Sequence, residues 1–521
     1  MQHALRTVLK LWHEARPLVD KGYVALDKTL VMGLPATSMP ASTQNQNSGI
    51  GSPYGKGAER VWHFWDHIIH KIMVGPVGKT SAATWHSPYL SSWNYNPFFI
   101  DLEKLTHQYK LPTTTLEKIY HRSKTDPYIN FKEVEKDYTT LLTMAYQQAK
   151  PDCSFTKFCN HLVYQQMQKT PFAYIGDIPI NVPAEISQRH PKWFLKDWTM
   201  GAPPDQYSPT PQLWGFPILK PTVLFNKNGK INPAGRLLKR LLRFYLDGQK
   251  GGIRIDHFIG WVDPYCFYTG TRNYPNGRLY SSPEIPPLKE YTYTRDEDFL
   301  YLAQKFLVPL FDEFHLSEMD IYPEDLGIRP LQMDYVLQTF NWGRMLPVQF
   351  NEPDNDYHLY HIRHATHKDI VVLSTHDNPR LMDFFHEIPQ TKRVLFARQL
   401  AQDLRFQYND NLCHPTWLYR MQWASALASP AHRISAFFTT ITGQEGRYNI
   451  PGTLDSWHLR SETEFELGYF KALKKRQAYN PFEAIRWAIY ARGDHFYQAH
   501  EELVHKLMVT EDQLFKTLQD L

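Results

Sequence analysis

The chain has 521 residues, of which 42% are hydrophobic and 21% are charged, proportions that are typical of a globular protein and exclude a disordered one. Its 57 basic and 53 acidic residues leave a net charge of +4 without a dense basic block, so nucleic acid is not an expected partner. The sequence has no run of 18 apolar residues and no signal-peptide run at its N-terminus, which predicts a cytoplasmic protein and no membrane partner.

The predicted elements begin with a short surface helix, because four apolar residues near the N-terminus have helical spacing: Leu5, Val8, Leu9 and Trp12. The polar stretch 41–51 then favours an exposed loop. Helical periodicity recurs at 131–150 and 155–168, and short β-rich apolar runs lie at 172–175, 252–255 and 369–373. Strands that alternate with helices predict an α/β protein with a parallel sheet.

Length alone allows either two to four domains or one barrel that carries large insertions. We expect a single catalytic barrel over residues 1–521, with a helical insertion at 103–170. A second, irregular insertion is expected at 265–315, since residues 269–298 are rich in Tyr, Pro, Gly and Arg. Long ordered loops of this kind are usually functional, so we place this insertion near the rim of the active site.

The first acidic motif closes the apolar run 252–255. Arg254 and Asp256 are two residues apart, so on a strand their side chains point to the same side. The guanidinium would hold the carboxylate ionised, as a nucleophile toward an anomeric carbon requires. A purely structural Arg–Asp pair would have the same pattern, and this motif alone does not distinguish the two.

Two further acidic motifs follow predicted strands. Glu324 precedes a turn that Gly327 closes, and Asp377 follows the run 369–373 directly. Barrel enzymes place their chemistry at the carboxyl ends of such strands. Fifty-three residues separate Glu324 from Asp377, which fits two strand–helix units of roughly 30 residues each. The spacing therefore predicts three carboxylates at one rim, on barrel strands four, five and seven.

Several motifs together resemble amylomaltase, glycoside hydrolase family 77, in the order in which that family has them. They are Gly176–Ile180, Gly201–Asp205, Gln212–Gly215, Arg254–Phe258, Glu324–Gly327 and Thr375–Asn378. Shorter matches flank them at Thr37–Pro40, Ser52–Gly55, Ser87–Tyr89, Asn96–Pro97, Ile100–Leu102 and Arg447–Gly452. The resemblance extends over nearly the whole chain, and six motifs in order are specific where any one is not.

The resemblance implies a (β/α)8 TIM barrel with inserted subdomains and a 4-α-glucanotransferase activity on α-1,4-glucan donors and sugar acceptors. It implies that Asp256 is the nucleophile, Glu324 the general acid/base and Asp377 the residue that steadies the distorted sugar. It also implies a set of substrate-binding residues: Arg254, His257, His376, Asn378, Asp205, Trp214, Tyr207 and Tyr89. Of these, Tyr89 would line the acceptor side. No cofactor or metal is expected, and the oligomeric state stays open.

Three positions depart from the family pattern. Gln206 stands in the groove loop where the family has an aromatic residue, Phe216 where it has Asn, and Ile259 where it has Arg. These departures leave the three carboxylates in place. They make chain-length preference and acceptor affinity the properties that the sequence predicts least well.

If the linkage broken and the linkage made are both α-1,4, the anomeric configuration is retained. Retention requires two inversions, for which the two carboxyl groups stand about 5–5.5 Å apart. We expect this separation for Asp256 and Glu324. One alternative is an α-amylase-like hydrolase with the same carboxylates, and another is a non-catalytic glucan-binding protein, which the presence of all three acids disfavours.

Overall fold

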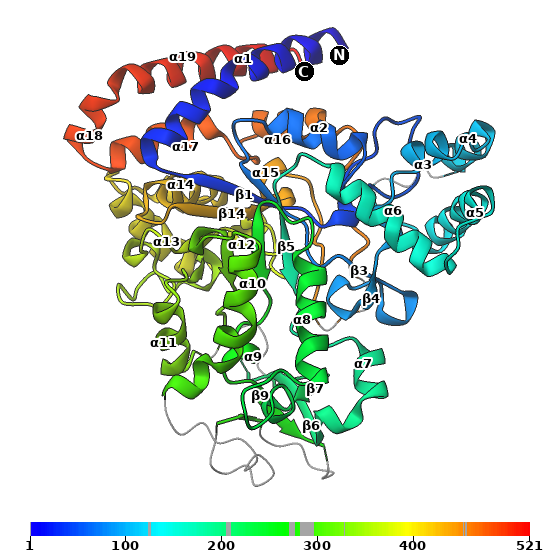
Figure 1. Cartoon of the computed structure of the whole chain (residues 1–521). Coiled ribbons are helices and arrows are strands. Elements are labelled where there is room, and N and C mark those ends of the chain that lie inside the picture. The colour runs from blue at the N-terminus through cyan, green and yellow to red at the C-terminus, as the bar shows by residue number, and fades with distance from the viewer. Residues whose placement is uncertain are drawn as a thin grey trace. The chain divides into compact units, whose positions relative to one another are not determined.

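A computed structural model of the chain describes residues 2–122, 127–204, 210–269, 277–281, 296–327, 329–451, 453 and 456–521. Among these residues, eight strands form one sheet in the order β11-β8-β5-β2-β1-β14-β13-β12 (Figure 1). The strands are β1 (Thr29–Gly33), β2 (Lys71–Met73), β5 (Tyr174–Ile178), β8 (Gly252–Ile255), β11 (Ile321–Pro323), β12 (Met345–Pro347), β13 (Ile370–Val372) and β14 (Arg433–Phe437).

The pairs β1–β14, β1–β2, β13–β14, β5–β8 and β11–β8 are all parallel. The two strands at the ends of the order, β11 and β12, are consecutive strands of the sheet along the chain. Such an order is that of a nearly closed (β/α)8 barrel of the TIM type, which confirms the predicted fold class. The runs predicted at 172–175, 252–255 and 369–373 correspond to β5, β8 and β13.

Two compact units make up the chain, and each is described by itself. The first comprises Met1–Val74, Tyr95–Ala173 and Leu346–Leu521, and the second comprises Gly75–Asn94 and Tyr174–Met345. None of the helices within the described ranges is long and apolar enough to cross a bilayer.

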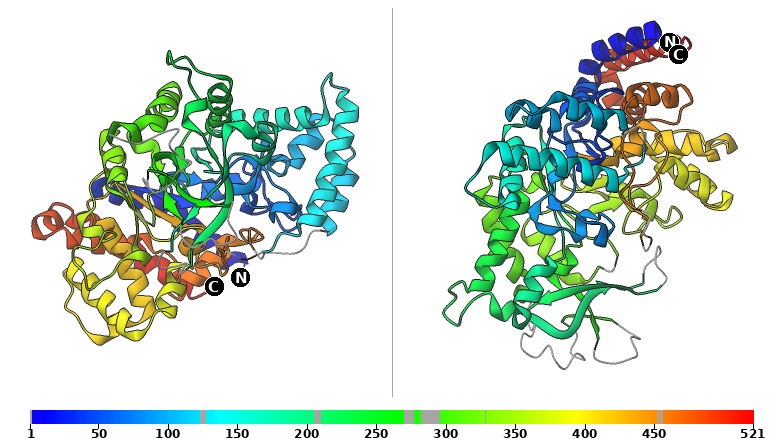
Figure 2. Two further views of the ribbon diagram at one scale, coloured as in Figure 1. Left: turned by 90° about the horizontal axis from the view of Figure 1, so that it is seen from below. Right: turned by 90° about the vertical axis from the view of Figure 1, so that its right-hand side faces the viewer.

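In the first unit, helices α1 (Gln2–Leu26) and α19 (Glu501–Leu518) lie side by side, and both chain ends are found there (Figures 1 and 2). The helix predicted at the N-terminus is present, but it is neither short nor confined to the surface, because α1 has 25 residues and buries Val8 and Trp12 completely. Trp12 stacks on Phe64 with 5.5 Å between ring centroids. The apolar stripe continues through Val19 and Tyr23, which are also fully buried, and this continuation lengthens the helix.

The polar stretch 41–51 is less exposed than expected. Asn47 and Ile50 are each only 2% exposed, although the neighbouring residues 43–45 face solvent. The Asn47 side-chain oxygen accepts hydrogen bonds from Gly49 N at 2.9 Å and from Arg460 Nη2 at 3.0 Å. A polar residue that finds such partners can be buried, which composition alone does not reveal.

The first unit also contains α3 (Leu102–Gln108), α4 (Thr113–Arg122), α5 (Phe131–Ala149) and α6 (Phe155–Lys169). Helices α5 and α6 confirm the periodicity predicted at 131–150 and 155–168. Each begins at a side-chain cap: Asn130 accepts from Glu133 N, and Ser154 accepts from Lys157 N.

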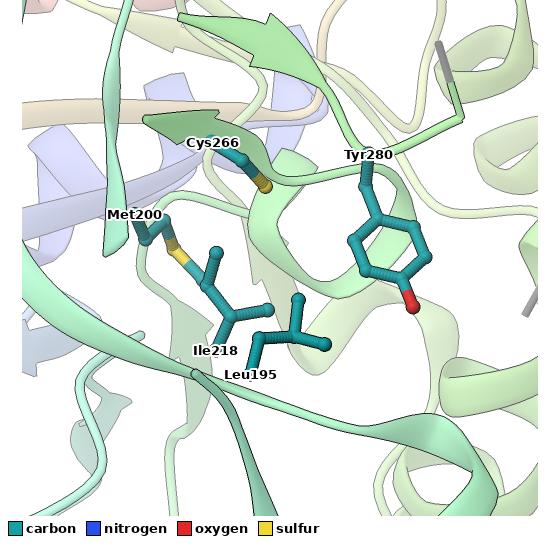
Figure 3. Close-up of a cluster of buried hydrophobic side chains, with 5 residues drawn as sticks. All are labelled: Leu195, Met200, Ile218, Cys266 and Tyr280. Atoms are coloured by element: carbon teal, nitrogen blue, oxygen red, sulfur yellow. The ribbon is translucent and has the colours of Figure 1, made fainter. Parts of the chain in front are cut away.

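The second unit carries a smaller antiparallel sheet in the order β10-β9-β6-β7. Its strands are β6 (Phe194–Ala202), β7 (Gln212–Leu219), β9 (Tyr265–Tyr268) and β10 (Arg278–Leu279). Figure 3 shows the buried cluster on this sheet, which consists of Leu195, Met200, Ile218, Cys266 and Tyr280. Trp214 and Phe216, both on β7, pack against this cluster, so buried side chains support the predicted groove residue Trp214.

Candidate active site

Two of the predicted catalytic carboxylates lie directly after neighbouring barrel strands of the second unit. Asp256 follows β8 and its backbone N–H donates to Ile178 O at 3.0 Å. Glu324 follows β11 and its N–H donates to Ile255 O at 3.0 Å. The parallel ladder thus continues into both residues, which fixes their backbones at the carboxyl ends of β8 and β11.

Arg254 links the two carboxylates. Its Nη1 lies 3.0 Å from Asp256 Oδ1, and its Nη2 lies 2.9 Å from Glu324 Oε2. The guanidinium is only 6% exposed, and the two carboxylates are 16% and 17% exposed. One planar guanidinium therefore orients both acids, whose side chains keep a small exposed fraction.

Asp177, the next-to-last residue of β5, is a further member of this cluster that the sequence analysis missed. It is 1% exposed, and one of its oxygens lies 2.6 Å from Arg254 Nη1. Tyr89, in the same unit, donates its hydroxyl proton to Asp177 at 2.8 Å, and its ring lies under the Arg254 guanidinium at 5.7 Å. A carboxylate in a buried apolar strand requires a positively charged partner. The position of Asp177 within such a strand could therefore have indicated that it pairs with a cation.

The cluster contains more negative than positive charge. Burial raises the pKa of Asp256 well above its ordinary range; Arg254 opposes this, while the charges of Glu324 and Asp177 and a hydrogen bond with Glu324 add to it. The expectation that Arg254 alone keeps Asp256 ionised was therefore incomplete. Arg254 faces three carboxyl groups, so its single positive charge does not offset the burial and the mutual repulsion that raise the pKa of Asp256.

His257 lies against both Glu324 and Trp214. Its backbone has a φ of 43°, and its N–H donates to Glu324 Oε2 at 2.8 Å. The imidazole packs edge-on against Trp214 with 4.5 Å between ring centroids. Burial lowers its pKa from 6.5 to about 4, which the charge of Glu324 partly offsets and that of Arg254 reinforces, so the ring is neutral at pH 7.

This shift predicts a pH-dependent contribution of His257 to stability. Between pH 6.5 and about 4 the unfolded chain binds a proton at His257 that the folded protein does not, so stability falls as the pH falls through this window. We compare the thermal midpoints of the wild type and of His257→Gln. The midpoint of the wild type should fall relative to that of the variant as the pH is lowered from 7 to 4. Differential scanning fluorimetry of both proteins measures it, and a constant difference would contradict the assignment.

The third predicted carboxylate, Asp377, belongs to a group in the first unit that follows β13. Its oxygens contact His376 Nε2 at 3.2 Å and the side-chain amide of Asn449, and its backbone carbonyl accepts from Arg447. The Asp377 side chain is 38% exposed. Arg447 and Asn449 lie in a motif that the sequence analysis singled out, but it gave neither residue a role.

Packing fixes the orientation of His376 and of the turn around it. The ring of His376 lies between those of Phe437 and Trp457, at 5.7 Å and 5.3 Å. The hydroxyl of Thr375 accepts from Asp377 N at 3.2 Å and hydrogen-bonds to the side chain of Asn378. The residues predicted at 375–378 therefore form one hydrogen-bonded turn that presents Asp377.

The structure thus brings Asp256, Glu324, Arg254, His257, Trp214 and Tyr89 together in the second unit, and His376, Asp377 and Asn378 together in the first. Counted along the chain, β8, β11 and β13 are the fourth, fifth and seventh strands of the sheet, as the spacing predicted. Asp205 and Tyr207, predicted to line the groove, lie outside the described residues, as does Gln206. Phe216 lies 5.6 Å from Trp214, and Ile259 is buried at the start of α9 (Ile259–Val262).

The sheet and the acids that follow its strands define a TIM-type barrel protein with an acidic cluster at the carboxyl ends of barrel strands. Residues 161–464, more than half of the chain, match the model of the glycoside hydrolase 77 family, 4-α-glucanotransferase. The chain belongs to this family, which the resemblance had predicted.

Individual relatives agree with this assignment. The chain is 26% identical to a 4-α-glucanotransferase from Thermus thermophilus over 290 residues, 53% of this chain and 51% of that protein. It is 23% identical to one from Clostridium butyricum over 503 residues, 80% of this chain and 93% of that protein. The fold resembles that of the amylomaltase from Streptococcus agalactiae in complex with acarbose, with a TM-score of 0.63 and 17% identity over 90% of this chain and all of that one.

Proposed function

We propose that this chain transfers α-1,4-glucan segments from a donor to a sugar acceptor by a double displacement that retains the anomeric configuration. The observation that supports it most directly is the contact of Arg254 with both Asp256 and Glu324, because retaining chemistry needs two oriented carboxyl groups beside one glycosidic bond. The separation of about 5–5.5 Å between the two carboxyl groups stays a prediction.

In the first step, an Asp256 carboxylate oxygen attacks the anomeric carbon of the donor. The bond from that carbon to the glycosidic oxygen breaks, and the leaving oxygen takes the proton of Glu324. The product of this step is a glucosyl ester on Asp256.

In the second step, the 4-hydroxyl of the acceptor gives its proton to the Glu324 carboxylate and its oxygen attacks the ester-bound anomeric carbon. Asp256 leaves as a carboxylate, which the nearby guanidinium of Arg254 stabilises. Glu324 is again protonated, so the cycle is closed and no other reactant is needed. Asp177 and Tyr89 act as positioning residues, since both contact Arg254 and Tyr89 also binds Asp177.

Asp377 is proposed to stabilise the positive charge that develops on the sugar ring. His376 and Asn449 hold its two oxygens, which restricts the carboxylate to one orientation. Trp214 offers an aromatic surface for a sugar face beside His257. A bound acceptor must outcompete water for the ester, and such a surface aligns it.

The products formed from maltotriose separate this function from that of a hydrolase. A transferase yields glucose together with a ladder of longer oligosaccharides, whereas a hydrolase of the α-amylase type yields only shorter sugars. We expect the ladder in chromatography of the reaction mixture. Products no longer than maltotriose would contradict the proposal, and unchanged maltotriose would favour the non-catalytic alternative. A cytoplasmic location stays a prediction.

A further inference from the structure

Three side chains that bind metals well lie together in the first unit: Asp27, His367 and His432. One ligand atom of each lies within 4.8 Å of those of the other two. Asp27 Oδ2 is 2.9 Å from His367 Nε2, and Asp27 Oδ1 is 3.0 Å from His432 Nδ1. This trio is separate from the group around Asp377, because it lies at the amino ends of the strands and Asp377 follows a carboxyl end.

Each residue of the trio lies just before the start of one of three adjacent strands. Asp27 lies two residues before β1, His432 directly precedes β14, and His367 lies three residues before β13. These strands are neighbours in the order β1-β14-β13, and Thr29 and Ile370 both pair with Arg433. The sheet itself therefore brings Asp27 to two histidines that lie more than 300 residues further along the sequence.

Hydrogen bonds fix the backbone around the three residues of the trio. His432 N donates to His367 O at 2.9 Å, and Thr29 N donates to His432 O at 2.8 Å. Asp27 has a left-handed φ of 55° at the end of α1, and its N–H donates to Val24 O at 3.1 Å. The other ring nitrogen of His432, Nε2, lies 2.8 Å from Thr29 Oγ1. A hydrogen bond at the second ring nitrogen is the usual means of orienting a metal-binding histidine.

We propose that Asp27, His367 and His432 bind one Zn²⁺ ion, with water as the fourth ligand. Two imidazoles and a carboxylate are a donor set that suits Zn²⁺ and not Ca²⁺ or Mg²⁺, which prefer oxygen ligands. Ligand bonds of about 2.0–2.1 Å place tetrahedral donors roughly 3.3 Å apart. In the structure each oxygen of Asp27 contacts one histidine, at 2.9 Å and 3.0 Å, so one oxygen must turn to face both imidazoles when the ion binds.

The ion would link the residue that follows α1 to the residues that precede β13 and β14. The aspartate and His367 side chains are 62% and 61% exposed, so an ion can reach the site from solvent. His432 is 24% exposed and forms its inner wall. The proposal does not depend on the glucan-transfer function, and loss of the ion is expected to leave transfer activity unchanged.

The alternative to metal binding is that the three side chains only hydrogen-bond to one another and so connect the segments that precede the strands. Two substitutions at one position distinguish the explanations. Glutamine at His367 can still donate a hydrogen bond to Asp27 but is a poor zinc ligand, whereas cysteine is a good zinc ligand and a poor hydrogen-bond donor. The matched control is His386→Gln, because His386 is an exposed histidine of α12 (Leu381–Glu387) outside the trio.

The experiment uses the tag-free chain of 521 residues, freed of metal with a chelator and kept reduced. Zn²⁺ binding is measured by competition with a chromophoric chelator, and thermal midpoints are recorded with Zn²⁺, Mg²⁺ and no metal. We expect one tight site per chain in the wild type and in His386→Gln, and a loss of at least about 100-fold in affinity in His367→Gln. His367→Cys should regain affinity to within roughly tenfold of the wild type.

Zn²⁺ should also raise the thermal midpoint of the wild type, and Mg²⁺ should not, because a ligand stabilises only the state that it binds. Equal zinc affinity in the wild type and His367→Gln would overturn the proposal. So would a His367→Cys variant that is folded but binds no better than His367→Gln.

Discussion

Replacing Asp256 by asparagine is expected to lower the rate of glucan transfer from maltotriose by at least about 10⁴-fold. The amide cannot form the ester that carries the glucosyl group between donor and acceptor, so no partial reaction survives. The rate is measured as glucose released per chain. Substrate binding should persist, because the change removes neither Arg254 nor Glu324.

The same variant should fold at least as well as the wild type. Asp256 is crowded by the carboxyls of Glu324 and Asp177, and a neutral amide relieves that repulsion. The thermal midpoint should therefore stay level or rise. Asp247→Asn, at the end of α8 (Pro233–Leu246), is the matched control, and it should keep full activity. A variant at Asp256 that still transfers glucan at wild-type rates would show that another residue is the nucleophile.

Glu324→Gln is expected to lower transfer from maltotriose by about 10³-fold, which is the contribution typical of a general acid/base. The glutamine keeps the shape of the side chain, and its oxygen can still accept the N–H of His257. What it loses is the proton for the leaving oxygen. A donor with a leaving group that needs no proton, such as α-maltosyl fluoride, should therefore form the ester at a rate closer to that of the wild type.

Breakdown of that ester should then become slow, because no base takes the proton of the acceptor. Azide, which attacks without losing a proton, should restore turnover and give the α-maltosyl azide. Glu318→Gln, just before β11, serves as the control on an exposed glutamate and should behave like the wild type. If Glu324→Gln lost activity equally with maltotriose and with the fluoride, Glu324 would not be the acid/base.

The sequence predicted the parts of the fold that local pattern determines. The run 252–255 is β8 with the same bounds, and α5 and α6 begin at the predicted residues because Asn130 and Ser154 cap them. The length of α1 was underestimated, since its burial depends on aromatic partners such as Phe64 that are distant in sequence. Propensity does not report such partners.

The pairing of Arg254 with Asp256 followed from a spacing of two residues on a strand, and the positions of Asp256 and Glu324 after barrel strands followed from chain spacing and the family motifs. The contact of Arg254 with Glu324 was not predicted. Asp177 was missed, because its significance depends on β5 lying beside β8, which places Asp177 opposite Arg254. The raised pKa of Asp256 was also missed. A sequence shows that Arg254 is near, but only the structure shows that it faces three acids.

The most direct test of the account is to trap the covalent intermediate. Glu324→Gln would be incubated with α-maltosyl fluoride, quenched in acid, digested and examined by mass spectrometry. The account predicts one maltosyl group per chain, on the peptide that contains Asp256 and on that residue. A maltosyl group on Asp177, Asp377 or any other side chain, or turnover of the fluoride with no labelled peptide, would contradict it.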